Sequence, residues 1–300
     1  MNLQENLLIT GATGFTGIHA YNHFIKQGFK VTAVGRKPSD FPKKVHVEYC
    51  ELTNKNDVKR LIQKIKPQYV LHLAGQNHVG KSWDDPISSL ETNSLATAYL
   101  LDALRKEVPS CKSLIVGSAL QFDLKELSTL SHPYGLSKTL QVLIAQSWAS
   151  LYNMHVVIAK PSNLIGPGAS NGVCSIFAQS IVKMEEKKIE KVLKVNNLYD
   201  RRDFLDVRDA VRAYEILLTK GKSGEIYDVT SGKSQSLGEV TQTFKALTHI
   251  DFEVKSHLTE KVEQFVEMKP LELANLGWEQ EFSFSSSLQD ILNFYRQHSL

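Results

Sequence analysis

Three regularly spaced glycines near the start of the chain constrain its fold more than any other feature. The sequence T-G-A-T-G-F-T-G at 10–17 follows a short apolar run and precedes apolar residues at helical spacing, which Gly28 closes. Gly11, Gly14 and Gly17 therefore lie between a predicted buried strand and a predicted helix. A strand, a glycine turn and a helix in this order form the phosphate-binding corner of dinucleotide folds, because the positive helix end attracts a pyrophosphate. We therefore predict a dinucleotide site here, although a glycine triplet alone also fits a flexible loop.

Composition sets the limits within which this site must lie. The 300 residues are 42% apolar and 22% charged, enough for one large domain or a dinucleotide domain with a smaller lobe. The net charge is +3 and the sequence contains no long run of like charges, which argues against nucleic-acid binding. The polar first residues and the lack of a long apolar run predict no signal peptide and no membrane span. The three cysteines are far apart, so we expect no metal site and a reduced, cytoplasmic protein.

Strand-like and helix-like segments alternate through the first half of the chain. Apolar runs predict strands at 30–35, 45–50, 69–75, 114–117 and 156–160. Helical spacing between them predicts helices at 57–65, at 91–108 and from 133 onward. This alternation is typical of a parallel, doubly wound sheet in the α/β class.

The end of the second predicted strand indicates which dinucleotide binds. An acidic residue at this position hydrogen-bonds the ribose of NAD, but here Arg36 and Lys37 follow the strand. Both are able to pair with the 2′-phosphate of NADP(H). We therefore favour NADP(H), with NAD(H) as the alternative if these are two solvated surface charges.

A second constellation comprises Ser118, Tyr134 and Lys138. Ser118 ends the fifth predicted strand, and Tyr134 and Lys138 lie four residues apart on one face of the following helix. A tyrosine with an ordinary pKa near 10 is a poor acid–base catalyst unless a cation stabilises its phenolate. Lys138 can supply that cation, and the Ser118 hydroxyl can bind a substrate oxygen. These residues predict proton transfer to or from a carbonyl oxygen next to the dinucleotide.

The motifs together resemble one enzyme superfamily. Besides the glycine turn they are H-L-A-G at 72–75, T-N-S-L-A-T at 92–97, G-S-A at 117–119, P-Y-G-L-S-K at 133–138 and R-D-F-L-D-V-R-D at 202–209. In order and spacing they are similar to the extended short-chain dehydrogenases/reductases (the NAD-dependent epimerase/dehydratase family) that act on nucleotide sugars. The resemblance covers nearly the whole chain. Within the superfamily it is strongest to the 4-keto-6-deoxy-sugar-nucleotide reductases, typified by the GDP-6-deoxy-4-keto-mannose reductases.

The resemblance implies an architecture and roles for individual residues. It implies a Rossmann-type, doubly wound sheet with a smaller C-terminal substrate-binding lobe. The dinucleotide-binding domain would span residues 1–162, with 204–224 returning to it, and the substrate-binding lobe would span 163–203 and 225–300. It implies a catalytic Ser118, Tyr134 and Lys138, with Asn93 completing their hydrogen-bond network. It also implies a homodimer, in which the Tyr134 and Asn93 helices form a four-helix bundle. Cofactor contacts are implied for Gly11, Thr13, Gly14, Phe15, Thr16, Gly17, Arg36, Glu51, Leu52, Leu73, Ala74, Gly75, Tyr134, Lys138 and Pro161. Substrate contacts are implied for Gln76, Ser118, Asn163 and Arg202, of which Arg202 meets the nucleotide diphosphate unless it forms a structural ion pair with Asp203 or Asp206.

Departures from the family pattern separate the candidate activities. Related 4,6-dehydratases carry two acids directly after the serine or threonine, whereas here Ala119 and Leu120 follow Ser118, so elimination of water lacks its acid and base. The segment between Ser118 and Tyr134 also differs, which predicts a rebuilt wall of the substrate pocket. We expect NADPH-dependent reduction of the C4 keto group of a 4-keto-6-deoxy sugar nucleotide, with GDP favoured over UDP or dTDP. A 4-epimerase with tightly held NAD is the alternative, and a non-catalytic NADP-sensing regulator is the alternative of another class.

Overall fold

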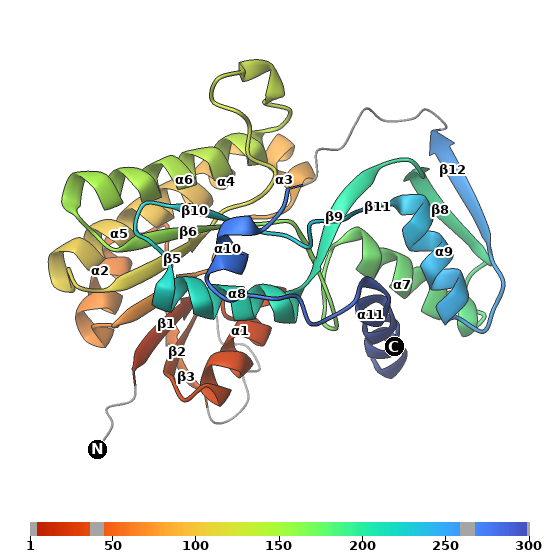
Figure 1. Cartoon of the computed structure of the whole chain (residues 1–300), viewed down its shortest axis with the longest axis horizontal. Coiled ribbons are helices and arrows are strands. Elements are labelled where there is room, and N and C mark those ends of the chain that lie inside the picture. The colour runs from red at the N-terminus through yellow and green to blue at the C-terminus, as the bar shows by residue number, and fades with distance from the viewer. Residues whose placement is uncertain (1–4, 37–44, 259–267, 299–300) are drawn as a thin grey trace. The chain divides into compact units, whose positions relative to one another are not determined.

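The computed structural model describes residues 5–36, 45–258 and 268–298 (Figure 1), so Lys37 lies outside the described residues. The chain divides into two compact units, Met1–Pro161 with Val211–Tyr227, and Ser162–Ala210 with Asp228–Leu300. The sequence predicts that residues 204–224 return to the first unit. In the structure the returning segment begins seven residues later, at Val211. The reason is that residues 201–206 form a strand in a sheet of the second unit.

The first unit is built on a seven-stranded sheet. The strand order is β10-β6-β5-β4-β1-β2-β3, and the five pairs from β6 to β3 are parallel. The chain thus starts in the middle of the sheet and winds outward in both directions, which confirms the predicted Rossmann-type, doubly wound α/β fold. The strands are β1 (Asn6–Thr10), β2 (Lys30–Gly35), β3 (His46–Tyr49), β4 (Tyr69–His72), β5 (Lys112–Val116), β6 (Val156–Pro161) and β10 (Ile226–Val229).

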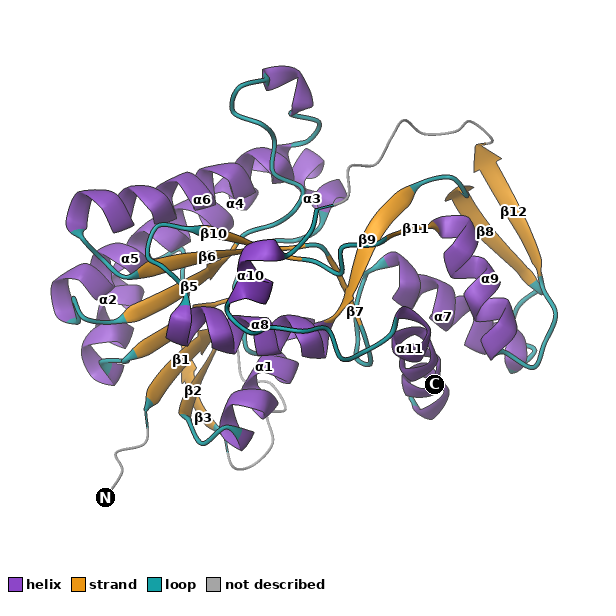
Figure 2. Cartoon of the chain, in the orientation of Figure 1, coloured by secondary structure: helices purple, strands orange, loops and turns teal. Residues whose placement is uncertain are grey.

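Helices cover both faces of this sheet (Figure 2). On one face lie α2 (Lys55–Ile65), α5 (Ala96–Glu107) and α6 (Pro133–Tyr152), which pack against one another in that order. On the other lie α1 (Phe15–Lys26) and α8 (Val207–Lys220), joined by a 2.6 Å contact between His23 Nε2 and Glu215 Oε2. The short helices α3 (Val79–Asp84) and α4 (Pro86–Leu90) follow β4.

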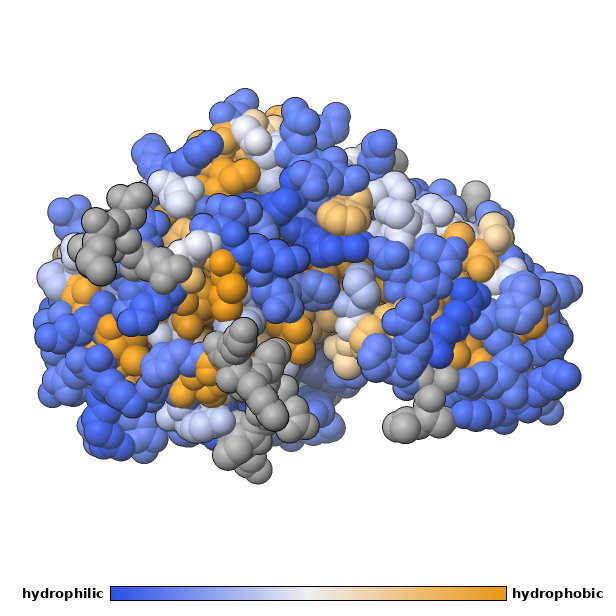
Figure 3. All heavy atoms as spheres, turned by 90° about the horizontal axis from the view of Figure 1, so that it is seen from below, coloured by the Kyte–Doolittle hydropathy of each residue, from blue (hydrophilic) through white to orange (hydrophobic). Residues whose placement is uncertain are grey.

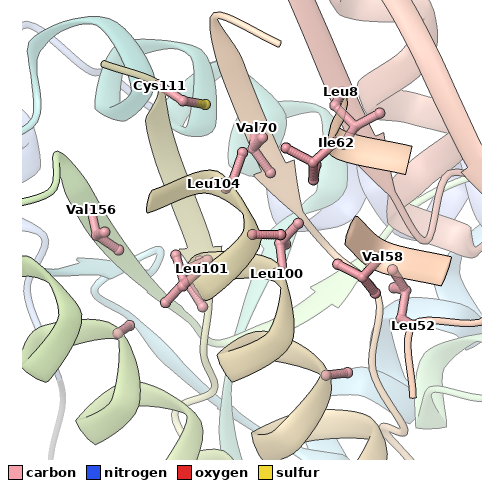
Figure 4. Close-up of a cluster of buried hydrophobic side chains, with 14 of the residues drawn as sticks. Leu8, Leu52, Val58, Ile62, Val70, Leu100, Leu101, Leu104, Cys111 and Val156 are labelled. Atoms are coloured by element: carbon pink, nitrogen blue, oxygen red, sulfur yellow. The ribbon is translucent and has the colours of Figure 1, made fainter. Parts of the chain in front are cut away.

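The core of the first unit follows from the two-residue period of its strands. Leu8 and Val70 face α2 and α5, whose Ile62, Leu100 and Leu104 meet them in one fully buried cluster (Figure 4). Burying such side chains stabilises the fold by about 1.5–3 kcal/mol each. This continuous core is what holds the carboxyl ends of the parallel strands in fixed positions.

The second unit has two small sheets and its own core. One sheet has the order β11-β9-β7, from Ser234–Ser236, Arg201–Asp206 and Asn163–Ile165, and the other pairs β12 (Glu253–Leu258) with β8 (Val192–Asn197). Around them lie α7 (Val173–Glu185), α9 (Leu237–Leu247), α10 (Leu271–Asn275) and α11 (Phe284–Gln297). Phe177, Phe244 and Ile291 are among the buried residues that join α7, α9 and α11. The sequence predicts α9 but not these short strands.

The surface and the composition of the described residues agree with an ordinary globular chain. One face shows charged and polar side chains interspersed with small apolar patches (Figure 3). No helix in the described ranges is both long enough and apolar enough to span a bilayer. Cys50, Cys111 and Cys174 are buried and unpaired. The same ranges contain no group of three His, Cys, Asp or Glu side chains that could hold a metal ion.

Candidate active site

The glycine turn between β1 and α1 is a tight backbone cradle. Gly11 has a φ of +68°, and a Cβ there would lie 2.7 Å from the Ala74 nitrogen. A Cβ on Gly17 would lie 2.6 Å from the Ala12 Cα and strike the Gly11 carbonyl. Gly14 precedes α1, and no side chain caps this helix, so its first amides stay open to an anion. The cradle therefore fits the pyrophosphate of a dinucleotide.

The predicted nucleotide-selecting residues follow β2 and β3. Arg36 is exposed directly after Gly35, the last residue of β2, and within the described ranges it has no carboxylate partner. Glu51 is exposed, and one of its oxygens accepts hydrogen bonds from the Thr53 amide (3.2 Å) and hydroxyl (2.9 Å). Leu52 is buried. Arg36 is thus a cation available to a ligand, whereas the Glu51 carboxylate already accepts hydrogen bonds within its own turn.

The structure brings Ser118, Tyr134 and Lys138 together. Ser118 follows the end of β5, Tyr134 is the second residue of α6, and Lys138 lies one turn later; all three are at least 90% buried. The Ser118 hydroxyl lies close enough to the Tyr134 phenol to lower its pKa. The Lys138 ammonium donates to the Val116 carbonyl at 2.7 Å. A buried phenol, a hydroxyl and an amine therefore converge at the carboxyl end of β5.

Burial sets the protonation of this trio. It raises the pKa of Tyr134, and the nearby Ser118 hydroxyl offsets only part of that effect. Burial lowers the pKa of Lys138 to about 7. Desolvation of the phenolate is the larger effect, so the net shift of the Tyr134 pKa is upward, and the predicted lowering of this pKa by Lys138 stays a prediction. The phenol stays protonated at neutral pH, the form that can donate a proton.

Asn93 ties the trio to the rest of the unit. It lies in a π-helical turn, Glu91–Leu95, that precedes α5, whereas the sequence predicts a continuous α-helix over 91–108. Its amide oxygen accepts from the Gln76 nitrogen at 2.8 Å, and its amide nitrogen donates to the Gln76 carbonyl at 3.0 Å and to the Ser137 hydroxyl at 2.9 Å. The Ser137 hydroxyl donates to the Tyr134 carbonyl at 2.8 Å. Asn93 thus fixes the loop after β4 and the first turn of α6.

A buried histidine extends this network to the glycine turn. His72 Nε2 lies 3.0 Å from the Thr97 hydroxyl, and its Nδ1 lies 2.7 Å from the Thr10 hydroxyl. The Thr97 hydroxyl donates to the Asn93 carbonyl at 2.7 Å, so it accepts from His72, whose proton is then on Nε2. Burial lowers the pKa of His72 to about 3 and keeps it neutral. His72 is thus a satisfied core histidine that also links β1 to the Asn93 helix.

The remaining cofactor and substrate candidates of the first unit lie around β4 and β6. Leu73 and Ala74 are half-buried, and a Cβ on Gly75 would lie 2.8 Å from the Asn93 amide oxygen. The Gln76 side-chain amide donates to the His78 carbonyl (3.0 Å) and the Ser89 hydroxyl (3.1 Å). Gln76 is therefore engaged in its own loop. Thr13, Phe15 and Thr16 line the glycine turn, and Pro161 ends β6.

In the second unit, Arg202 is free of the ion pairs considered as its alternative role. The Asp203 carboxylate accepts from the Ser231 nitrogen at 3.0 Å and from the Ser231 hydroxyl at 2.9 Å. Asp206 pairs with Arg208 at 2.8 Å. Arg202 itself is half-buried and has no carboxylate partner in the described ranges. Asn163 donates from its amide to the Asp203 carbonyl at 3.1 Å.

The segment between Ser118 and Tyr134 carries no acid that could replace those of a dehydratase. It projects from the first unit ahead of α6 (Figure 1) and exposes Leu127 at 71%. Its carboxylates are exposed and bind their own turn: Asp123 accepts from the Lys125 nitrogen and Glu126 from the Ser128 hydroxyl. Both carboxylates are therefore engaged in their own turns and do not stand directly after Ser118, where a dehydratase carries its acid and base.

The burial of Lys138 gives a prediction about stability and pH. Its pKa of about 7 lies below the ordinary 10.5, so the unfolded chain binds this proton more tightly. The resulting cost is complete below pH 7 and fades as the pH rises from 7 to 10.5. We expect Lys138→Met to abolish turnover but stabilise the fold by about 1 kcal/mol at pH 6, with a smaller gain at pH 9.

Thermal unfolding at both pH values measures this difference, with the exposed Lys59→Met as the matched control, for which no pH-dependent gain is expected. A lower melting temperature of Lys138→Met at pH 6 would show that the buried ammonium stabilises the fold instead.

Comparisons with known proteins agree with this fold. The chain is 28% identical to the GDP-6-deoxy-D-mannose reductase of Pseudomonas aeruginosa over 97% of each chain. It is 24% identical to the UDP-glucose 4-epimerase of Yersinia enterocolitica over 95% of this chain and 96% of that one. The structure of RMD from Pseudomonas aeruginosa complexed with NADPH has a TM-score of 0.84 and 27% identity, covering 98% of this chain and all of that one. Residues 7–230 match the family model as well, and the chain belongs to the NAD dependent epimerase/dehydratase family.

Proposed function

We propose that the protein reduces the C4 keto group of a 4-keto-6-deoxy sugar nucleotide with NADPH, in the cytoplasm, and that GDP is the favoured nucleotide. The observation that carries the proposal is the buried Tyr134 phenol, which lies beside the buried Ser118 and is kept protonated by its raised pKa. A reduction needs an acid at the carbonyl oxygen, and this phenol is in the acid form at neutral pH.

The cofactor proposal rests on the glycine cradle and on Arg36. The cradle and the uncapped start of α1 suit a pyrophosphate, so an NAD(P) cofactor fits the first unit. Enzymes that select NAD carry an acid at this position, which would repel the 2′-phosphate of NADP(H). Here the position is occupied by Arg36, which can pair with that phosphate and has no competing carboxylate in the described ranges. The similar RMD of Pseudomonas aeruginosa was solved with NADPH, which supports the same choice.

Each residue of the trio has a role in this mechanism. A bound nicotinamide cofactor supplies the hydride. Tyr134 donates its phenolic proton to the C4 oxygen as negative charge develops there, and Ser118 donates a hydrogen bond to the same oxygen. Lys138, charged at and below a pH of about 7, stabilises the phenolate that remains. Asn93 keeps the first turn of α6, and with it Tyr134, in place through Ser137.

The second unit supplies the proposed contacts to the nucleotide. We assign cofactor binding to residues 1–161 with 211–227 and substrate binding to 162–210 with 228–300. Arg202 is a half-buried cation without a carboxylate partner in the described ranges, and a guanidinium pairs bidentately with the oxygens of a diphosphate. GDP is favoured because the GDP-6-deoxy-D-mannose reductase matches this chain over nearly its full length.

A 4-epimerase is the second candidate, favoured by the match to a UDP-glucose 4-epimerase. A panel of GDP-, UDP- and dTDP-4-keto-6-deoxy sugars with NADPH, run beside the corresponding 4-hydroxy sugar nucleotides with NAD, separates the two. A reductase consumes one NADPH per keto sugar, whereas an epimerase must first oxidise a C4 hydroxyl and so turns over only the 4-hydroxy sugars, with no net consumption of cofactor. A regulator that only senses NADP has no need of a buried Ser118 and Tyr134, and it would turn over no member of either set.

We expect Tyr134→Phe to lower kcat by about 10²–10⁴-fold, because the substituted ring keeps its packing but has no proton to donate. NADPH binding, measured by fluorescence titration, should change little. Tyr152→Phe on the same helix is the matched control, since its ring is half-exposed and far along α6. Full activity of Tyr134→Phe with the substrate identified by the panel would refute the mechanism.

We expect Arg36→Asp to lower the ratio of kcat/KM for NADPH over NADH by about 10–100-fold, since a lost hydrogen bond to a charged group is worth roughly 1.5–3 kcal/mol. Steady-state kinetics with both cofactors gives the ratio. Arg60→Asp reverses another exposed arginine, on α2, and should leave the ratio unchanged. An unaltered ratio in Arg36→Asp would assign the preference to other residues.

We also propose that the protein is a homodimer joined through α5 and α6. Apolar side chains on α6 and on the π-helical turn that precedes α5 are open to solvent, among them Leu151 at 73% and Leu95 at 43% exposed. Leu140, Leu143 and Ile144 on α6 are only half-buried. A second copy of the same pair of helices would cover these apolar side chains and form a four-helix bundle.

Light scattering should give twice the chain mass of 33.7 kDa, and Leu151→Arg should shift the mass toward the monomer because it buries a charge in the interface. Leu124→Arg, on the loop before α6, is the exposed control. A monomeric mass for the unaltered protein would contradict the proposed dimer.

A further inference from the structure

The helix that carries Tyr134 begins in an unusual way. Pro133 is its first residue and has no N–H, so the next two amides, those of Tyr134 and Gly135, need acceptors from outside the helix. The Gly135 amide donates to His132 Nδ1 at 2.8 Å, and the Tyr134 amide donates to the Ser82 hydroxyl at 3.0 Å. The backbone amide of Tyr134 therefore depends on a serine hydroxyl, and the amide of the next residue depends on a histidine ring.

The geometry fixes the protonation of His132. A backbone amide can only donate, so Nδ1 must carry a lone pair and the ring proton must be on Nε2. The ring also packs closely, since a Cβ on Gly135 would lie 3.1 Å from Nδ1. Its centroid is 5.9 Å from that of Tyr134, the titratable side chain in contact with it. Within the described ranges, no carboxylate pairs with His132 to hold a proton on the ring.

The second acceptor belongs to α3, which packs against α6. The Ser82 hydroxyl donates its own hydrogen to the Val79 carbonyl at 2.6 Å and thus accepts from the Tyr134 amide. α3 is itself capped by a histidine, because the Lys81 amide donates to His78 Nδ1 at 3.2 Å. Among the described helices, histidines therefore cap α3 and α6, and only the cap by His132 binds the helix of Tyr134 directly.

We propose that His132 is a positioning residue whose neutral imidazole holds Tyr134 in its reactive place, and that protonation of His132 releases the helix start and lowers turnover. A proton on Nδ1 and the hydrogen bond from Gly135 exclude each other. The imidazolium would also place positive charge at the positive end of α6. This inference rests on the proposed reduction for its kinetic effect, but not for its structural one.

The reaction itself provides no competing reason for a loss of activity in acid. Tyr134 acts as the acid, and its protonated form persists at low pH because burial raises its pKa. Lys138 gains its charge as the pH falls through about 7. Histidines ordinarily change charge between roughly pH 5 and 8. A fall of kcat on acidification that His132→Asn removes therefore reports the cap.

The experiment compares His132→Asn with His132→Ala and with the control His78→Asn. Asparagine is a good helix cap that does not titrate, so His132→Asn should keep kcat at pH 8 and abolish its acidic decline. His132→Ala should lower kcat at pH 8 by about fivefold with little change in the KM for NADPH. His78→Asn should retain the acidic decline. The proposal fails if His132→Asn keeps that decline or if His78→Asn abolishes it.

A second measurement does not depend on the substrate. The ¹⁵N–¹H resonance of the Gly135 amide should shift, and its hydrogen exchange should accelerate, as the unaltered protein is acidified from pH 8 to 5. Neither change should occur in His132→Asn. If no sugar nucleotide is turned over, this titration still decides the role of His132, and an amide that does not respond to pH overturns it.

Discussion

The side-chain amide of Asn93 is the interaction on which the rest of the candidate site depends. It binds both backbone groups of Gln76 and the hydroxyl of Ser137, so one residue joins the loop after β4 to the helix of Tyr134. Both amide hydrogens and the oxygen are used, and the residue is fully buried. An apolar replacement would leave several buried partners unsatisfied, each at a cost of about 1–3 kcal/mol. Geometry at this site is therefore imposed by hydrogen bonding more than by apolar packing.

The same burial that fixes this geometry also sets the chemistry. Tyr134 is held in the proton-donating form and Lys138 has a lowered pKa because both are removed from water. The second unit differs, since its most buried carboxylates are bound by hydrogen bonds: Asp206 accepts from Ser287 and Asp209 from the amides of Glu281 and Phe282. Within the described ranges, the first unit thus keeps a buried lysine without a carboxylate partner where reaction is proposed, whereas the buried Asp206 and Asp209 of the second unit are hydrogen-bonded.

Much of the first unit could be predicted from the sequence because its signals are local. The glycine turn, the apolar strands and the spacing of Tyr134 and Lys138 each depend on residues close in the chain. The π-helical turn at Asn93 could not be predicted, since it is set by contacts with Gln76 and Ser137, which are 17 and 44 residues away. Ser82 and His132 were missed for the same reason: a cap on another element, or a histidine used as an acceptor, leaves no periodic pattern. The strands of the second unit are short and only partly apolar, so tertiary pairing decides them.

The discontinuity of the first unit has a consequence for how the chain folds during synthesis. Residues 211–227 supply most of α8 and part of the edge strand β10, and Glu215 of α8 bonds to His23 of α1. Until they emerge from the ribosome, β6 is an unpaired edge and part of one sheet face is uncovered. Residues 162–210 of the second unit are made in this interval. The nascent chain must therefore carry an open parallel sheet while about fifty further residues are added, a state prone to aggregation.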